Sequence, residues 1–374
     1  MTVALHDLSV DLRTLSSYVR EVRPSLPANA FDPVPSRLAW LTLHVAIIAA
    51  GITALAMHWG GWWAAPLYAL AIGHSFAGAA FVGHETLHGA VVRNRGVRHL
   101  VGWICFLPFM MSPRLWVAWH NKTHHAHTMD EAKDPDCFPS LASYRKSRVA
   151  QIADRVAFAH GRPFGWLTLC LGFTGQSTQM MWRWAKNADA MNTRERRLAI
   201  FETALTWAVW GAVLWLVGPA RFVFAYGIPL IIGNVIVISY ILTNHSLSPM
   251  TAINDPLVNS LTVTAPRFIE KLHLNFGLHV EHHLFPSMSS HYAPLVRDEL
   301  VRRWPERYQS LPLMRAMVML ARTPRVYRTD DRLHDPRTGV EASTLLPRAV
   351  GAAANDATPA LQVTDVPNAE PVAV

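Results

Sequence analysis

Charge and cysteine are the two features of which this sequence has little. Only 16% of its 374 residues are charged and 51% are apolar, whereas a soluble globular domain carries about 25% charged residues. This shortfall indicates a protein that contacts lipid. The three cysteines, Cys105, Cys137 and Cys170, are widely spaced and form no C-x-x-C pair. They therefore offer neither a disulfide framework nor a thiolate metal site.

Two further signatures are missing. The sequence contains no nicotinamide-binding fingerprint, so an oxidoreductase built from it would need electrons from another protein. The formal net charge is +8, but the basic residues do not form a tract with interleaved aromatic residues. We therefore expect no nucleic-acid partner, and the placement of the charge fits a membrane surface better.

Long apolar runs indicate an all-α membrane protein with four transmembrane helices, because a span needs about 20 residues. The predicted spans cover residues 38–59, 62–83, 198–217 and 222–243. Gly60 and Gly61 join the first two, and Gly218 and Pro219 separate the second two, so the spans form two hairpins. We expect 101–111 to be re-entrant or interfacial, and 164–181 to be an amphipathic helix in the interface.

The distribution of Lys and Arg predicts the orientation of these spans. Of the 34 basic residues, 16 lie between the second and third spans, 4 before the first and 13 after the fourth. By the positive-inside rule, both termini and the long central loop are cytoplasmic. The predicted organisation is a cytoplasmic segment (1–37), a membrane domain (38–328) with a cytoplasmic helical cap, and a disordered tail (340–374).

The 19 histidines are unevenly distributed, and three clusters stand beside predicted span ends. The first box is H-E-T-L-H, the second is H-N-K-T-H-H and the third is H-V-E-H-H. Spacings of three and four residues place imidazoles on one face of a helix. Neutral imidazole binds iron, zinc, copper or nickel. Eight histidines exceed what one tetrahedral zinc needs, so they fit two metals with open positions for a small molecule.

The three boxes, in this order around two hairpins, resemble those of the membrane fatty acid desaturase superfamily, over residues 38–328. The third box continues into L-F-P, which is similar to acyl-lipid desaturases. The resemblance implies two irons held by the box histidines, which here are His84, His88, His120, His124, His125, His279, His282 and His283. It implies a further ligand at His245; where some members carry an asparagine four residues earlier, this chain has Ile241. His279, in place of a glutamine, and the absence of a haem module argue against the front-end branch.

Several residues near the boxes have two readings. Glu85, Glu281 and His127 are predicted to orient the ligand histidines, because a carboxylate inside a box can accept the outer ring N–H. Asp134 and Asp136 flank Pro135 and are most simply turn residues in a solvated loop. Trp116 and Trp119 could line an acyl channel or anchor the chain at the interface.

The resemblance implies that the protein desaturates an acyl lipid or acyl thioester. It would use O2 and electrons from a donor of the ferredoxin or cytochrome b5 type. A di-iron hydroxylase of lipid, carotenoid or alkane would use the same boxes. A membrane zinc hydrolase would need fewer histidines and no O2. A histidine-rich metal transporter would place its ligands at the bilayer midplane, whereas these lie at span ends.

Overall fold

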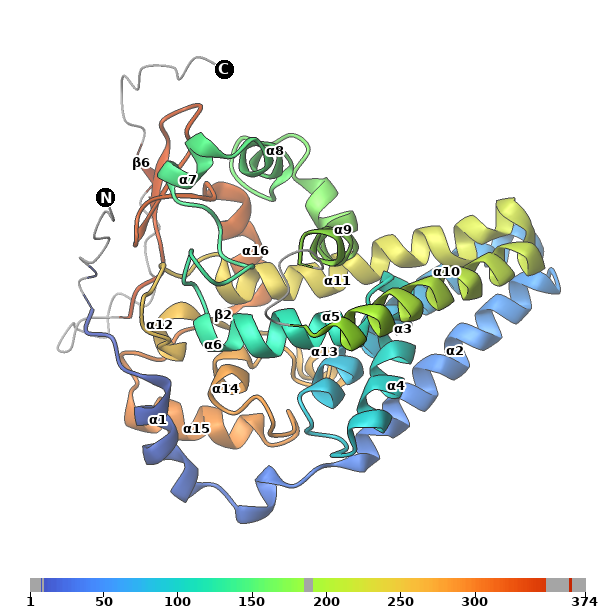
Figure 1. The fold of residues 1–374 in the computed structure, drawn as a ribbon, viewed down its shortest axis with the longest axis horizontal. Coiled ribbons are helices and arrows are strands. Elements are labelled where there is room, and N and C mark those ends of the chain that lie inside the picture. The colour runs from blue at the N-terminus through green and yellow to red at the C-terminus, as the bar shows by residue number, and fades with distance from the viewer. Residues whose placement is uncertain (1–7, 9, 185–190, 348–362, 365–374) are drawn as a thin grey trace.

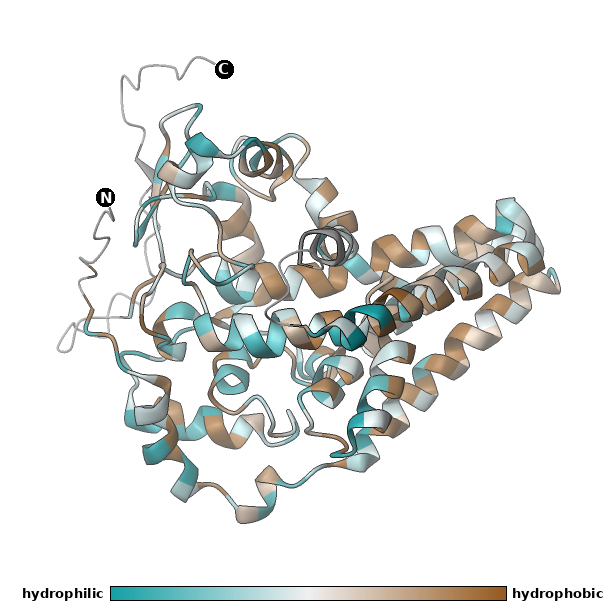
Figure 2. Ribbon diagram, viewed as in Figure 1, coloured by the Kyte–Doolittle hydropathy of each residue, from teal (hydrophilic) through white to brown (hydrophobic). Residues whose placement is uncertain are grey.

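The computed structural model describes residue 8 and residues 10–184, 191–347 and 363–364. Four helices run along an arm that projects from the larger part of the molecule (Figure 1). These are α2 (Leu38–Ala56), α3 (Gly61–Leu87), α10 (Thr193–Phe222) and α11 (Ile228–His245). Figure 2 shows hydrophobic residues along the arm and hydrophilic residues around α5, α6 and α14. The amino-acid pattern therefore divides the molecule into a part suited to lipid and a part suited to water.

Three helical stretches are long and apolar enough to cross a membrane: Pro35–Ala56, Gly61–Leu87 and Thr193–His245. The last has 53 residues, which a straight α-helix would extend over roughly 80 Å, well beyond the ~30 Å core of a bilayer. It is not straight, because Gly218 adopts φ 76° and ψ 161°, a backbone conformation that favours glycine. In Figure 1, α10 and α11 meet at the far end of the arm.

A bent pair of helices, Arg95–Phe109 and Pro113–His127, meets at 99° and forms a broken span or a re-entrant loop. The sequence predicts a re-entrant or interfacial element over 101–111, most of which lies within the first of these helices. Residues 164–181 were expected to form an interfacial helix, and α9 (Trp166–Trp184) covers most of that range. Its place in the membrane stays a prediction.

Helix α3 is the central element of the arm, and small residues allow its neighbours to approach closely. A Cβ at Gly78 would lie 2.2 Å from Nε2 of His44 on α2. On another face, a Cβ at Gly73 would lie 2.7 Å from Cβ of Ile232 on α11. Close packing at small residues is the usual basis of helix association in membranes. It fixes the inner end of α3, which carries the first histidine box.

The remaining helices are mostly short. The α-helices are α1 (Leu15–Val22), α4 (Arg95–Phe106), α5 (Pro113–Trp116), α6 (His125–His127), α7 (Leu141–Lys146), α8 (Arg148–Val156), α12 (Pro256–Asn259), α13 (Arg267–Leu272), α14 (His279–Leu284), α15 (Ala293–Arg303) and α16 (Leu313–Arg322). The 3₁₀ turns are η1 (Arg23–Ser25), η2 (Ala28–Phe31), η3 (Pro35–Arg37) and η4 (Leu107–Phe109), and the π-helices are η5 (Val117–His124) and η6 (Val223–Gly227).

Two small sheets correct the all-α prediction. The parallel pair is β1 (Thr262–Thr264) with β2 (Ser310–Pro312). The antiparallel sheet has the order β3 (Val326–Thr329), β4 (Arg332–His334), β5 (Glu341–Ser343) and β6 (Val363–Thr364). Strands of two to four residues carry no readable alternation. The prediction of a disordered tail from residue 340 is wrong for 341–345, where β5 pairs with β4 and the Leu345 N–H donates to the Leu247 carbonyl. Residues 348–362 and 365–374 lie outside the described residues.

A second apolar core joins the N-terminal segment to the third box. Tyr18 and Val22 of α1 pack with Val280 of α14 and with Val296 and Leu300 of α15. All five side chains are buried. This core holds α14 against the rest of the cap, so the third box is positioned by packing on both sides of its helix.

Candidate metal centre

The three histidine boxes meet at the inner end of the arm. The first box occupies the C-terminal turn of α3, the second lies on η5 and the start of α6, and the third lies on α14. Helix α11 ends at His245, which joins them. Segments up to 200 residues apart in the sequence thus share one buried volume.

The second box lies on a π-helix, in which backbone hydrogen bonds link residues i and i+5. The N–H of His125 donates to the carbonyl of His120 in this manner. One turn of this wider helix after His120 ends between residues 124 and 125. His124 and His125 therefore lie on either side of the direction in which His120 points. As a result, one short helix contributes histidines to two neighbouring sites. Single π turns of this kind occur frequently at functional sites.

The first histidine cluster consists of His84, His88, His120 and His282, whose ring nitrogens lie within 4.8 Å of one another. The Nε2 atoms of His84 and His120 are 3.2 Å apart. Nε2 of His125 lies 3.1 Å from Nε2 of His120 and 3.1 Å from Nε2 of His282. His125 therefore borders this cluster and faces it.

The second histidine cluster consists of His124, His245, His279 and His283, all of which are buried. Nε2 of His279 lies 2.8 Å from Nε2 of His245 and 3.1 Å from Nε2 of His283. Two imidazole nitrogens bound at about 2.1 Å from one metal, at right angles, would be about 3 Å apart. The spacing in both clusters is therefore that of a ligand set.

Hydrogen bonds to the outer ring nitrogens fix the tautomer of several histidines. Nδ1 of His124 donates to Oδ1 of Asp134 over 2.9 Å, and Nδ1 of His245 donates to the Asn259 carbonyl over 3.1 Å. A metal-bound imidazole is neutral and carries one proton, so when these rings bind a metal each would offer its lone pair at Nε2 to the cluster. Nδ1 of His283 lies 3.3 Å from the Thr128 hydroxyl.

A metal fits these groups better than hydrogen bonding alone does. Burial, and secondarily the neighbouring imidazoles, lowers the pKa of His279, His282 and His283 well below the usual histidine range, so these rings are neutral. Nε2 of His88 is buried and has no hydrogen-bond partner. Buried polar atoms are rarely left unpaired. Nitrogen lone pairs that point towards one another repel, and a cation bound between them offsets this repulsion.

An apolar cavity of about 500 Å³ opens on both clusters. Its wall includes His84 and His120 of the first cluster, and His124, His245 and His279 of the second. The rest of the lining is almost wholly apolar and includes Ala80, Phe81, Phe106, Trp116, Trp119, Phe173, Val237, Ile241 and Phe276. Of the two readings of Trp116 and Trp119, cavity lining is the one that the structure supports, since both side chains are buried.

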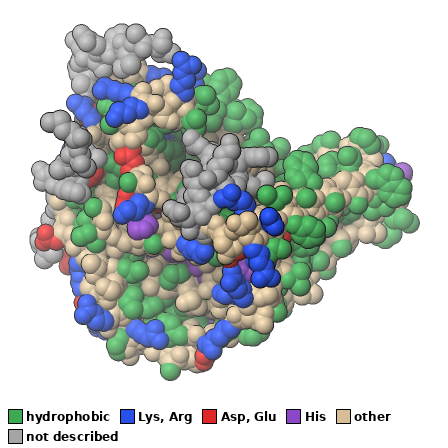
Figure 3. Space-filling model, viewed as in Figure 1, with side chains coloured by type: hydrophobic (Ala, Val, Ile, Leu, Met, Phe, Trp, Pro, Cys, Tyr) green, Lys and Arg blue, Asp and Glu red, His purple; other side chains and the backbone are tan. Residues whose placement is uncertain are grey.

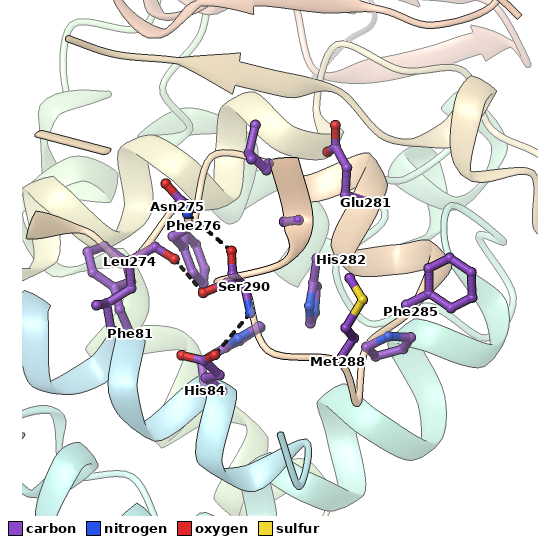
Figure 4. A pocket seen from close by; sticks show the side chains of 14 residues that line it. Phe81, His84, Leu274, Asn275, Phe276, Glu281, His282, Phe285, Met288 and Ser290 are labelled. Carbon is purple, nitrogen blue, oxygen red and sulfur yellow. Dashed lines mark hydrogen bonds between the residues drawn. The ribbon is translucent and has the colours of Figure 1, made fainter. Parts of the chain in front are cut away.

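A second opening, the outer cavity, reaches the first cluster from another side and measures about 460 Å³. Figure 4 shows His84 and His282 on its wall, with Met288 and Phe285 beside His282. Glu85 also lines this cavity.

The hydrogen bonds that the described residues show for the box carboxylates come from groups other than imidazole rings. Their predicted role as acceptors of a ligand histidine's ring N–H stays a prediction. Glu85 accepts hydrogen bonds from Nε of Arg37 over 3.0 Å, from the Ser290 N–H over 2.9 Å and from the Ser289 hydroxyl. It thereby ties the first box to the N-terminal segment and to the loop after the third box.

Glu281 accepts from the hydroxyls of Thr262 and Tyr308 over 2.6 and 2.5 Å, and burial raises its pKa. These bonds hold α14 against β1 and the segment before β2. His127 is half-buried and belongs to neither cluster.

Asp134 is the functional residue that the sequence did not reveal. It was expected in a solvated turn, but it is buried and binds His124. Asp136 lies 3.5 Å from the same ring nitrogen and, with His120 and His124, forms a further group of possible ligands. The available signal was the pair of aspartates shortly after a histidine box, a position from which a loop can fold back on its helix.

Together, the long apolar helices, the two histidine clusters and the apolar cavity define an integral membrane metalloprotein that acts on an apolar substrate. Residues 60–312 match the family model for fatty acid desaturases. The chain therefore belongs to the fatty acid desaturase family. It is an oxidoreductase whose histidine boxes form the metal site.

Curated relatives are similar at modest identity. An sn-1 oleoyl-lipid 12-desaturase from Synechocystis sp. is 22% identical, over 76% of this chain and 82% of its own length. An sn-1 acyl-lipid omega-3 desaturase (ferredoxin) from the same organism is 30% identical over 32% of this chain and 33% of its own length. A chloroplastic sn-2 acyl-lipid omega-3 desaturase (ferredoxin) from Helianthus annuus is 24% identical, over 75% of this chain and 65% of its own length.

Proposed function

We propose that the protein introduces a double bond into an acyl chain carried by a membrane lipid, using O2 and two irons. The observation that carries this proposal is the apolar cavity, because histidines of both clusters line it beside apolar side chains that suit an alkyl chain. An unactivated methylene has no acidic proton, so acid–base side chains alone cannot oxidise it. The overall balance is one O2, two electrons and two protons consumed for each double bond and two waters formed.

The proposed ligands divide between the two clusters. His84, His88, His120, His125 and His282 would hold one iron, and the other iron would be held by the four histidines of the second cluster. Iron supplies the redox chemistry that zinc lacks. Family membership sets aside the zinc hydrolase and the metal transporter.

The protein itself orients the ligand histidines and keeps water away from the reacting carbons. Asp134 and the Asn259 carbonyl hold His124 and His245 in one tautomer and one orientation. Phe106, Phe173 and Ile241 give the alkyl chain an apolar surface and exclude water from the reacting carbons.

The names of the relatives support a lipid as the carrier of the acyl chain, and the sequence supports an external electron donor. The relatives named above act, by their names, on acyl lipids, and two names include ferredoxin. The chain has no dinucleotide fingerprint, so we propose an external donor of the ferredoxin type.

We also propose that four spans in two hairpins place both termini and the metal centre on the cytoplasmic side. Of the 34 Lys and Arg residues, only Arg221 falls in a predicted hairpin loop. Cysteine labelling tests this scheme: residues near 130 and 320 should be protected from an impermeant external reagent, and Gly60→Cys should be labelled.

The experiment that tests the reaction is lipid analysis of a host that expresses the protein with a ferredoxin donor. We expect acyl chains that have lost two hydrogens, only when O2 is supplied, and about two irons per purified chain. His279→Ala is the inactive control. A gain of one oxygen would instead identify a hydroxylase, and conversion without O2 would refute the mechanism.

A further inference from the structure

A polar hollow of about 930 Å³ lies against the metal centre, separate from the two cavities already described. Its lining includes four cationic side chains, those of Arg95, Arg98, Arg114 and Lys122. We call it the basic hollow. Nothing in the desaturation chemistry requires such a concentration of positive charge.

The positive charge is only partly balanced within the described residues. Arg95 forms an ion pair with Glu195, and Nε of Arg114 contacts Glu202 over 2.9 Å. Arg98 forms no ion pair with any described residue. Arg98 thus adds a positive charge that no described carboxylate pairs with, and such a charge in a hollow attracts an anion. Guanidinium groups are well suited to phosphate because they donate two parallel hydrogen bonds.

The basic hollow shares a wall with the first histidine cluster. Leu87 and Asn121 line it, and the Asn121 side chain donates to the Leu87 carbonyl over 3.2 Å. These residues adjoin His88 and His120 in the sequence. Nη1 of Arg98 lies 3.0 Å from the position that a Cβ on Gly89 would occupy, so its guanidinium group packs against the end of the first box.

One helical segment, from Pro113 to His124, separates the basic hollow from the apolar cavity. Arg114 and Lys122 face the hollow, whereas Trp116 and His120 line the cavity. A charged group and an alkyl chain of one molecule could therefore lie on either side of this segment.

The position of the basic hollow along the membrane normal favours a lipid. Leu100 of α4 and Ile200 and Phe201 of α10 are exposed apolar side chains next to it in the sequence. The first turns of α10 are charged and the apolar run follows, so we expect the hollow to lie where the helices leave the hydrocarbon. Figure 3 shows Lys and Arg side chains gathered near the start of α10, beside the hydrophobic arm. Lipid phosphates occupy this level of a bilayer.

We propose that the basic hollow binds the phosphate of the molecule that carries the acyl chain, and that this molecule is a membrane phospholipid. The assignment to the substrate rests on the proposed function, whereas the binding of phosphate does not. The same chemistry could come from the phosphates of a soluble acyl thioester of coenzyme A.

The test is a binding measurement on the full chain, loaded with iron, in a neutral detergent. Native mass spectrometry compares dioleoyl-phosphatidylglycerol with dioleoylglycerol, which has the same acyl chains but no phosphate. We expect the phospholipid to bind more tightly, and Arg98→Gln to weaken its binding about fivefold while leaving dioleoylglycerol unchanged. Arg98→Lys keeps the charge and should retain most of the binding. Arg93→Gln is the matched control, because Arg93 is exposed and pairs with Asp32 outside the hollow.

The outcomes separate this inference from the proposed function. Equal binding of phosphatidylglycerol to the parent chain and to Arg98→Gln would overturn the phosphate site, whatever the turnover. If Arg98→Gln does not fold, equal binding of the two lipids by the parent chain would overturn it equally. Oleoyl-coenzyme A that displaces the lipid and depends on Arg98 more strongly would overturn the choice of a phospholipid. Normal phosphate binding without desaturation of any substrate would instead contradict the proposed function. A rise in KM for phospholipid with unchanged kcat in Arg98→Gln supports the site.

Discussion

Nδ1–H of His124 donates a hydrogen bond of 2.9 Å to Oδ1 of Asp134, and both side chains are buried. The same carboxylate accepts the backbone N–H groups of Met129 and Asp136 over 2.7 and 3.0 Å. Burial opposes its charge, but His124 and these N–H groups outweigh burial and lower the pKa of Asp134. The loop after the second box is thus built to hold an ionised acceptor behind one histidine of the second cluster.

Asp134→Asn should weaken metal binding in the second cluster without removing any histidine. The amide is a poorer acceptor for Nδ1–H of His124, so the ring loses its fixed tautomer, and such changes typically cost about 10- to 100-fold in affinity. Iron per chain after dialysis against a weak chelator measures the effect. Asp130→Asn, in the same loop but paired with the half-exposed Lys133, should keep its iron. Full iron retention in Asp134→Asn would contradict the assigned role.

Adjacent histidines should serve different irons. His282 belongs to the first cluster and His283 to the second, so each alanine variant should lose about one of two irons and all activity. His127→Ala is the matched control, because His127 follows the second box but lies in neither cluster. Two variants that lose the same iron, distinguished by Mössbauer spectra of the remaining metal, would refute the division.

Removal of the metal should lower the stability of the whole protein. Nine imidazoles, eight of them buried, would lose their metal partners. A ligand at about a thousand times its Kd stabilises the folded state by about 4 kcal/mol. We expect the unfolding midpoint in detergent to fall on treatment with a ferrous chelator and to recover when ferrous iron is added. His279→Ala should show a much smaller response. An unchanged midpoint in the parent chain would mean that the clusters are stable without metal.

The helices of the arm and the site histidines were accessible from the sequence because both follow from local regularities. Apolar runs give the long helices, and spacings of three and four residues give the boxes. The division into clusters was not accessible, because it depends on the π-helix that turns His124 and His125 to opposite sides. Spacing in the sequence assumes an α-helix, in which adjacent residues lie about 100° apart and His125 would point away from His120.

The partners of the carboxylates could not be predicted because they come from distant segments. Glu85 meets Arg37 and Ser290, and Glu281 meets Thr262 and Tyr308. A carboxylate inside a box was expected to support its own histidines. Its hydrogen bonds in the structure join the box to the surrounding chain, and those partners depend on tertiary packing.

A buried ion-pair cluster outside the metal centre should control the stability of the C-terminal part. Arg162 contacts Asp335 over 2.8 Å and Asp154 over 2.6 Å, and Arg162 and Asp335 are almost fully buried. Asp335→Ala leaves the guanidinium group half paired, which should cost about 3 kcal/mol. Arg337→Gln is the control, since Arg337 is 42% exposed and lies 3.8 Å from the same carboxylate; exposed pairs contribute about 0–1 kcal/mol. Equal midpoints for the two variants would contradict the argument.

The same carboxylate should make stability depend on pH. Burial opposes the charge of Asp335, but Arg162 and the Arg337 N–H outweigh burial and lower its pKa. A lowered folded pKa gives stability that is present above the unfolded pKa of about 3.9 and is lost as pH falls through the folded value. Thermal midpoints between pH 7 and pH 3 should therefore fall less steeply in Asp335→Asn than in the parent chain. Parallel curves would show that Asp335 titrates alike in both states.

Filling the apolar cavity should stop turnover while leaving the metal in place. Ala80 is buried on α3 and lines the cavity one turn before His84, so Ala80→Leu adds three carbons where the acyl chain is expected. Overpacking of this kind costs about 1–3 kcal/mol, which the fold can absorb, but it removes space that the substrate needs. We expect at least a tenfold loss of kcat/KM for long acyl chains, corresponding to about 1.4 kcal/mol, with unchanged iron content. Ala71→Leu makes the same change on the exposed face of the same helix and should remain active. Full activity of Ala80→Leu would show that the acyl chain does not bind in this cavity, and loss of iron in that variant would show that Ala80 supports the metal centre instead.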